Sequence, residues 1–109
     1  MSEPVTFYPD LGAEEQPPER GIHSQTVDDG PDVRIVLFGF AAGEELSEHT
    51  ASRPAIVHVL AGNGRAVAGG VHHEIGPGSW FRMAAGTAHS IRADTPLTMA
   101  LYLLRPATE

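Results

Sequence analysis

The chain has 109 residues, of which 41% are hydrophobic and 19% are charged, a composition typical of one soluble globular domain rather than a disordered segment. It contains no cysteine, which excludes disulfides, thiolate metal sites and cysteine nucleophiles, so any metal must be held by nitrogen or oxygen ligands. Fourteen acidic residues outnumber seven basic ones, and the formal charge of −7 disfavours binding to nucleic acid or to an anionic membrane surface.

The amino-terminal region is predicted to be an arm that precedes a single domain. Residues 1–20 include PDLGAEEQPPER, whose prolines and acidic residues favour a loose arm or one that lies along a sheet edge, of this chain or of a partner. The first residues lack the basic and apolar pattern of a signal peptide, and no apolar run approaches the roughly 20 residues of a membrane helix. We therefore expect an arm over 1–20, one domain over 21–109 and a cytoplasmic location.

Short apolar runs separated by glycine and proline fill the rest of the chain. The expected strands are DVRIVLFGF (32–40), AIVHVLAG (55–62), two short strands in RAVAGGVHHEI (65–75), the end of GPGSWFRM (76–83), AHSIRA (88–93) and LTMALYLL (97–104). The best helical candidate, AAGEELSE (41–48), is too short and is interrupted by glycine. Turn signals about every 8 to 12 residues, without helices, predict an all-β antiparallel sandwich or barrel.

Three histidines, His49, His58 and His89, lie on or beside the predicted strands. Small β-barrels bind ligands inside, and a neutral imidazole nitrogen is the commonest nitrogen ligand of metals. Three such groups from different strands would hold Fe, Mn, Ni, Cu or Zn and leave coordination positions open.

Two segments resemble the two sequence motifs of the cupin superfamily, and the resemblance covers roughly residues 30–104. One motif has a glycine, His-x-His, a glutamate and a closing glycine, and the other has a glycine, Pro-x-Gly, a histidine and an asparagine. The positions that match are Gly43, His49 and Gly62 in the first motif and Gly78, Gly86 and His89 in the second. The resemblance implies a small single-domain cupin, whose fold is the double-stranded β-helix or jelly-roll barrel.

The chain departs from both motifs at positions where cupins carry functional residues. Alanines replace the second histidine, the glutamate, the proline and the asparagine, at Ala51, Ala55, Ala84 and Ala93. Of four usual metal ligands, His49 and His89 remain, and two ligands alone rarely hold a divalent ion tightly.

His58 is the candidate for a third ligand. If residue 55 faces inward, strict alternation turns residue 58 outward, whereas a bulge or a strand register with His58 inward rebuilds the site. The resemblance to compact cupins favours a metal site of His49, His58 and His89. A less favoured alternative is a carboxylate, Glu45 or Glu48, beside His49 and His89.

Six residues are expected to line a ligand pocket inside the barrel, with core packing as the alternative for its aromatic and apolar members: Phe38, Phe40, Ala51, Ala55, Trp80 and Met83. His72 and His73 adjoin one another, so at most one of them faces inward on a strand, and both are interpreted as surface or core residues. His23 matches no motif position.

Three functions remain open at this level, because cupins host many activities. The chain is expected to bind a divalent transition metal, a small organic ligand or both inside the barrel. The three hypotheses are a metal-dependent enzyme of the oxygenase or isomerase type, a non-catalytic binding module, and a structural or regulatory protein with a vestigial site. A homodimer is expected, because a small single cupin leaves apolar sheet faces and edge strands for a second subunit to cover.

Overall fold

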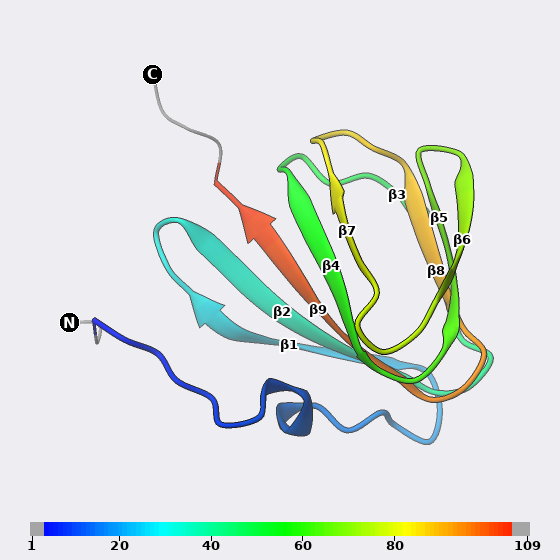
Figure 1. The fold of residues 1–109 in the computed structure, drawn as a ribbon, viewed down its shortest axis with the longest axis horizontal. Helices are drawn as coiled ribbons and strands as arrows, with labels where there is room; N and C mark the ends of the chain where they lie inside the picture. The colour runs from blue at the N-terminus through cyan, green and yellow to red at the C-terminus, as the bar shows by residue number, and fades with distance from the viewer. Residues whose placement is uncertain (1–3, 106–109) are drawn as a thin grey trace.

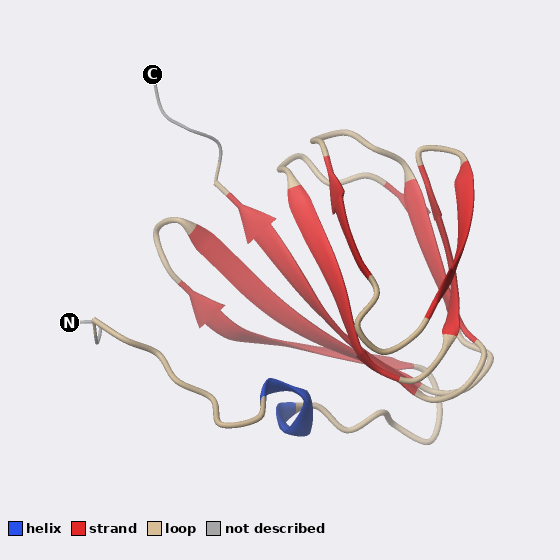
Figure 2. Cartoon of the chain, in the orientation of Figure 1, coloured by secondary structure: helices blue, strands red, loops and turns tan. Residues whose placement is uncertain are grey.

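Short strands that end at glycine or proline turns arrange themselves in two antiparallel sheets. The structure, a computed structural model, describes residues 4–105, and its sheets face one another as an open barrel (Figures 1 and 2). The strands are β1 (Ile22–Asp29), β2 (Val33–Phe40), β3 (Glu45–His49), β4 (Ala55–Ala61), β5 (Gly64–Ala68), β6 (Val71–Ile75), β7 (Trp80–Met83), β8 (His89–Ala93) and β9 (Leu97–Leu104). The sheet orders are β1-β2-β9-β4-β7 and β3-β8-β5-β6. This jelly-roll arrangement confirms the predicted all-β double-stranded β-helix.

Two strands and a short 3-10 helix were not predicted from the sequence. Strand β1, with the sequence IHSQTVDD, is a polar edge strand, and β3, ELSEH, is largely exposed, so neither carries an apolar run. The segment considered as a helix, AAGEELSE, contains most of β3 instead. A single 3-10 turn, η1 (Leu11–Glu14), lies in the arm, and among residues 4–105 no helix is long and apolar enough to cross a membrane.

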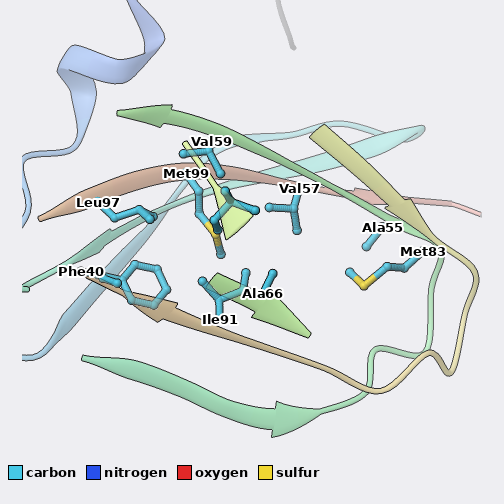
Figure 3. Close-up of a cluster of buried hydrophobic side chains, with 11 residues drawn as sticks. Phe40, Ala55, Val57, Val59, Ala66, Met83, Ile91, Leu97 and Met99 are labelled. Atoms are coloured by element: carbon cyan, nitrogen blue, oxygen red, sulfur yellow. The ribbon is translucent and has the colours of Figure 1, made fainter. Parts of the chain in front are cut away.

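The core lies between the two sheets and is built from alternate residues of each strand. In β4 the side chains of Ala55, Val57 and Val59 are buried against the opposite sheet, while the residues between them are only half-buried (Figure 3). The other core residues labelled in Figure 3 are Phe40, Ala66, Met83, Ile91, Leu97 and Met99. Because each large apolar side chain gains about 1.5–3 kcal/mol on full burial, this alternation sets the strand register.

The described part of the arm lies against the chain's own large sheet. Its anchor is Glu15, whose side chain is 1% exposed although it is a carboxylate. The Nδ1 of His23 lies 2.8 Å from one Glu15 oxygen, and the Gln25 side-chain amide donates to the other at 2.7 Å. The Thr98 hydroxyl donates to the Glu15 backbone carbonyl. The contacts with His23 and Gln25 satisfy the buried carboxylate, as a buried charged group requires.

Gly39 makes room for this anchor. It lies between His23 and Thr98 in the sheet, on the outward face. A Cβ atom at Gly39 would come within 2.8 Å of a Glu15 carboxylate oxygen and 3.1 Å of the Pro17 Cα. The arm can therefore lie this close to β2 only because residue 39 has no side chain.

We predict that Gly39→Ala destabilises the domain by about 1–3 kcal/mol, the usual cost of an added methyl group in a tightly packed site. Gly30→Ala is the control, since its Cβ meets neighbours only at 3.7 Å and beyond, and neither glycine has a positive φ. Urea denaturation measures both variants. Equal stabilities of the two variants would contradict the close packing of the arm.

Candidate ligand site at the two-histidine end of the barrel

One end of the barrel is formed by the loops of residues 50–54 and 84–88. The first loop joins the end of β3 at His49 to the start of β4, and the second joins β7 to the start of β8 at His89. Both loops lie at the upper end of the barrel in Figure 1. The Gly86 amide donates a hydrogen bond to the Ala51 carbonyl at 2.8 Å, so the loops that carry the two cupin-like motifs are tied directly to one another.

A type II turn positions the start of β8. The Thr87 amide donates to the Ala84 carbonyl at 3.2 Å, and Gly86, the third residue of the turn, has a φ of 84°. This turn type requires a positive φ at that position, which glycine adopts without strain. The turn forms with Ala84 at the motif's proline position, and the Thr87 hydroxyl adds a second bond to the same carbonyl at 2.8 Å.

The structure brings His49 and His89 together. They are Cα partners across β3 and β8, after a register shift between Leu46 and His49, and their ring centroids are 4.2 Å apart with planes tilted by 58°. His89 is 5% exposed, and His49 is exposed. Partners in a sheet point to the same face, so the pair extends from the barrel interior to its mouth.

Both rings present the same nitrogen to a possible ligand. The Nδ1 of His49 lies 2.8 Å from the Ser47 carbonyl, and the Nδ1 of His89 lies 2.9 Å from the Thr87 carbonyl. A carbonyl oxygen only accepts hydrogen bonds, so each Nδ1 must carry the proton and donate it. In the neutral rings Nε2 is therefore left with a lone pair, the arrangement found in metal-binding histidines whose other nitrogen bonds a backbone carbonyl.

His58 does not join this pair, contrary to the expectation that it faces into the barrel. Its strand neighbours Val57 and Val59 are buried in the core, so His58 points to the outer face, where its Cα partners are Trp80 and Ala100. Strand β4 does have a register shift, but it falls after Val59 and leaves the alternation at position 58 unchanged.

No other side chain in the described part of the chain completes a metal site with the two histidines. Within residues 4–105, no group of three or more His, Cys, Asp or Glu side chains could hold a metal ion. Glu45 lies 3.9 Å from Arg92, its register partner in β8, and Glu48 is exposed. The two imidazole nitrogens therefore fit a metal only as a two-ligand attachment, and the three-histidine and two-histidine-one-carboxylate sets are not assembled.

The residues expected to line a pocket fall into different environments. Phe40, Ala55 and Met83 are buried in the core cluster, and Phe38 packs against it with its ring centroid 6.3 Å from that of Phe40. Ala51 is half-buried in the loop bonded to Gly86. Trp80 does not face the barrel interior as expected, because it is 57% exposed and its register with His58 turns it to the outer face.

The backbone carbonyl contacts that orient the two histidines were not predicted from the sequence. Ser47 and Thr87 each lie two residues before a histidine and contribute only backbone atoms. No residue type marks such a contact, since it depends on the local backbone path. His23 likewise matched no motif, and it bonds the buried Glu15.

We predict that the neutral rings of His49 and His89 carry their proton on Nδ1, because each Nδ1 faces a backbone carbonyl. Long-range proton–nitrogen correlation spectra of the ring nitrogens distinguish the two tautomers directly, and His49→Ala and His89→Ala assign the signals. An Nε2-protonated form of either ring would contradict the assignment of its lone pair.

The fold resembles solved structures of known proteins. A cupin superfamily protein from Desulfitobacterium hafniense is 21% identical with a TM-score of 0.83, and the match covers 94% of both chains. KdgF from Halomonas sp. is 27% identical with a TM-score of 0.71, over 79% of this chain and 81% of that one. Salicylate 1,2-dioxygenase from Pseudaminobacter salicylatoxidans is 19% identical with a TM-score of 0.73, over 76% of this chain and 26% of that one.

The sequence comparison gives the family. No curated protein matches the chain. Residues 36–104, more than half of the sequence, match the Cupin domain family, and the matched segment contains both histidine motifs. The chain therefore belongs to the cupin family.

Proposed function

We propose that this cupin binds a small organic ligand at the barrel end that carries His49 and His89, together with a divalent transition metal attached to the two histidines. The supporting observation is the pair itself. Both Nδ1 atoms are engaged by backbone carbonyls, and both Nε2 lone pairs remain for a ligand. Imidazole nitrogen suits Zn, Cu, Fe and Ni.

The number of protein ligands sets the character of the proposed site. Catalytic zinc sites have three protein ligands and structural sites four, whereas His49 and His89 supply two. A metal held this way keeps most of its coordination positions for water and for the organic ligand, and its affinity for the protein alone is low. When bound, the metal would polarise an oxygen of the ligand as a Lewis acid.

The surroundings favour an organic ligand with its own oxygen donors. Alanines occupy both motif positions from which a histidine and a glutamate would otherwise reach the metal, at Ala51 and Ala55. Oxygen atoms of a chelating ligand would take those positions. The dioxygenase among the structural neighbours acts on salicylate, which has such donors, and this supports the ligand class while the low identity leaves the reaction open.

The first test is metal titration by calorimetry, with Zn²⁺ and Ni²⁺ added to protein without a purification tag. We expect weak binding at one site that falls by at least about tenfold in His49→Ala and in His89→Ala, because loss of even an outer-shell partner costs about 10- to 100-fold. His58→Ala is the matched control on the outer face and should bind like the wild type. Equal losses in all three variants, or no binding by the wild type, would contradict the two-histidine attachment.

The second test restores the motif ligands in the variant Ala51→His/Ala55→Glu. We expect metal affinity to rise at least about tenfold, and the metal at 100 times its Kd to stabilise the fold by about 2.7 kcal/mol. Without metal the variant should be less stable than the wild type, because position 55 is 1% exposed and an unpaired carboxylate there is costly.

Thermal unfolding with and without metal measures both effects. Ala93→Glu is the control, since Ala93 is equally buried but lies at the other end of β8 from His89. It should be destabilised whether or not metal is present. Metal rescue of the control, or none in the double variant, would count against the site's location.

A further inference from the structure

A second pocket, called the arm pocket below, lies between the amino-terminal arm and the outer face of the large sheet, beside β1 (Figure 1). Its volume is about 300 Å³, at the lower limit of the usual range of about 300–1,000 Å³ for ligand pockets. The sheet contributes Val27, Asp28 and Ile35 to its lining, and the arm contributes the other residues. His49 and His89 belong to the other sheet, so the arm pocket is separate from the two-histidine site.

The strand register places the Asp28 side chain on the floor of this pocket. Ile35 shares its face of the sheet with its Cα partner Tyr102, and hence with Ile56, whose neighbours on β4 point into the core. Asp28 is the Cα partner of Ile35 and therefore lies on the same outer face. The register shifts just before Asp28, where Val27 is an extra residue. Such a β-bulge re-aims side chains, and this one brings two consecutive residues of β1 to one pocket.

The arm is held over the same place by two side-chain hydrogen bonds. The Tyr8 hydroxyl donates to the Val27 carbonyl at 2.6 Å, and the Thr6 hydroxyl donates to an Asp28 carboxylate oxygen at 3.4 Å. Because both bonds cross from the arm to the bulge in β1, the arm forms the wall opposite the sheet. The Asp28 side chain lies between the two.

The charge and the walls of the arm pocket are unusually matched. Asp28 is half-buried, and its contact with Thr6 is longer than the usual O–H···O distance of about 2.5–3.0 Å. None of the ion pairs found within residues 4–105 includes Asp28, and no basic side chain of these residues lines the pocket. Ile35 and Leu11 form apolar walls, and Phe7, which is 76% exposed, lies at the rim. A partly buried charge is costly without an opposite charge, so this carboxylate attracts a cation that also has apolar surface.

We propose that the arm pocket binds a small primary amine with an apolar body. The protonated amine donates hydrogen bonds to the Asp28 carboxylate, and its apolar part contacts Ile35 and Leu11 and covers Phe7. The charge-assisted hydrogen bond fixes the orientation of the ligand, and the apolar contact adds affinity. The proposal does not depend on metal or ligand binding at the two-histidine end.

Calorimetry with benzylammonium chloride on metal-free protein tests this site. Two further probes each lack one feature, since benzyl alcohol has the apolar body without the charge and ammonium chloride has the charge without the body. We expect a Kd of about a millimolar for benzylammonium, as is usual for a ligand of few atoms, and binding at least about tenfold weaker for the other two probes.

Asp28→Asn should weaken benzylammonium binding by at least about tenfold, because it removes the charge from the hydrogen bond and keeps an oxygen for Thr6. Asp29→Asn is the matched control. It changes the net charge equally at the next, exposed residue of β1 and should bind like the wild type. Leu11→Ala keeps the carboxylate, removes part of an apolar wall and should also weaken binding. Circular dichroism verifies the fold of each variant.

Backbone amide spectra locate the bound probe, and we expect benzylammonium to shift the resonances of Thr6, Asp28 and Ile35 and to leave those of His49 and His89 unchanged. Several results would overturn the proposal. They are no saturable binding by the wild type, equal affinity for either of the other two probes, wild-type affinity in Asp28→Asn or in Leu11→Ala, and shifts at the two-histidine end instead of at the arm pocket.

Discussion

The 2.8 Å hydrogen bond from the Gly86 amide to the Ala51 carbonyl joins two loops that are 35 positions apart in the chain. On one side of it β3 ends at His49, and on the other β8 begins at His89. The type II turn at Gly86 and the register shift before His49 bring the two histidines into Cα register. The distance between the imidazole rings, and hence any shared ligand, depends on this connection.

Alternation along β4 decides what surrounds the pair. Its inward residues are small or branched and fill the core, so Ala55, rather than a histidine, faces the interior near the two-histidine end. Moving His58 inward would require a shift of one residue, and that shift would expose Val57 and Val59 to solvent. Since each buried valine contributes about 1.5–3 kcal/mol, the core holds His58 on the outer face.

The amino-terminal arm covers one region of the large sheet and leaves another exposed. Glu15 is buried beside β1, β2 and β9, where Gly39 admits it. The β6 and β7 edges lie at the other side of the sandwich, where no described part of the arm covers them, and Trp80 is exposed there. Edge strands with unpaired backbone groups and an exposed aromatic residue are where a β-barrel accepts ligands or partners.

The sequence by itself determined the fold class, most of the strands and the family, because turn glycines, apolar runs and motif spacing are local features. Motif spacing also pointed to His49 and His89, and the structure places their rings side by side. It could not place β1 and β3, whose polar residues lack a strand signal.

Only the tertiary structure decided the rest. The side chains of His58 and Trp80 point to the outer face of the large sheet because of the strand register, which long-range packing sets. The tautomers of the two histidines follow from backbone carbonyls whose positions no residue type reveals. The burial of Glu15 depends on which neighbours the folded chain brings within reach, and these neighbours lie in strands of the large sheet.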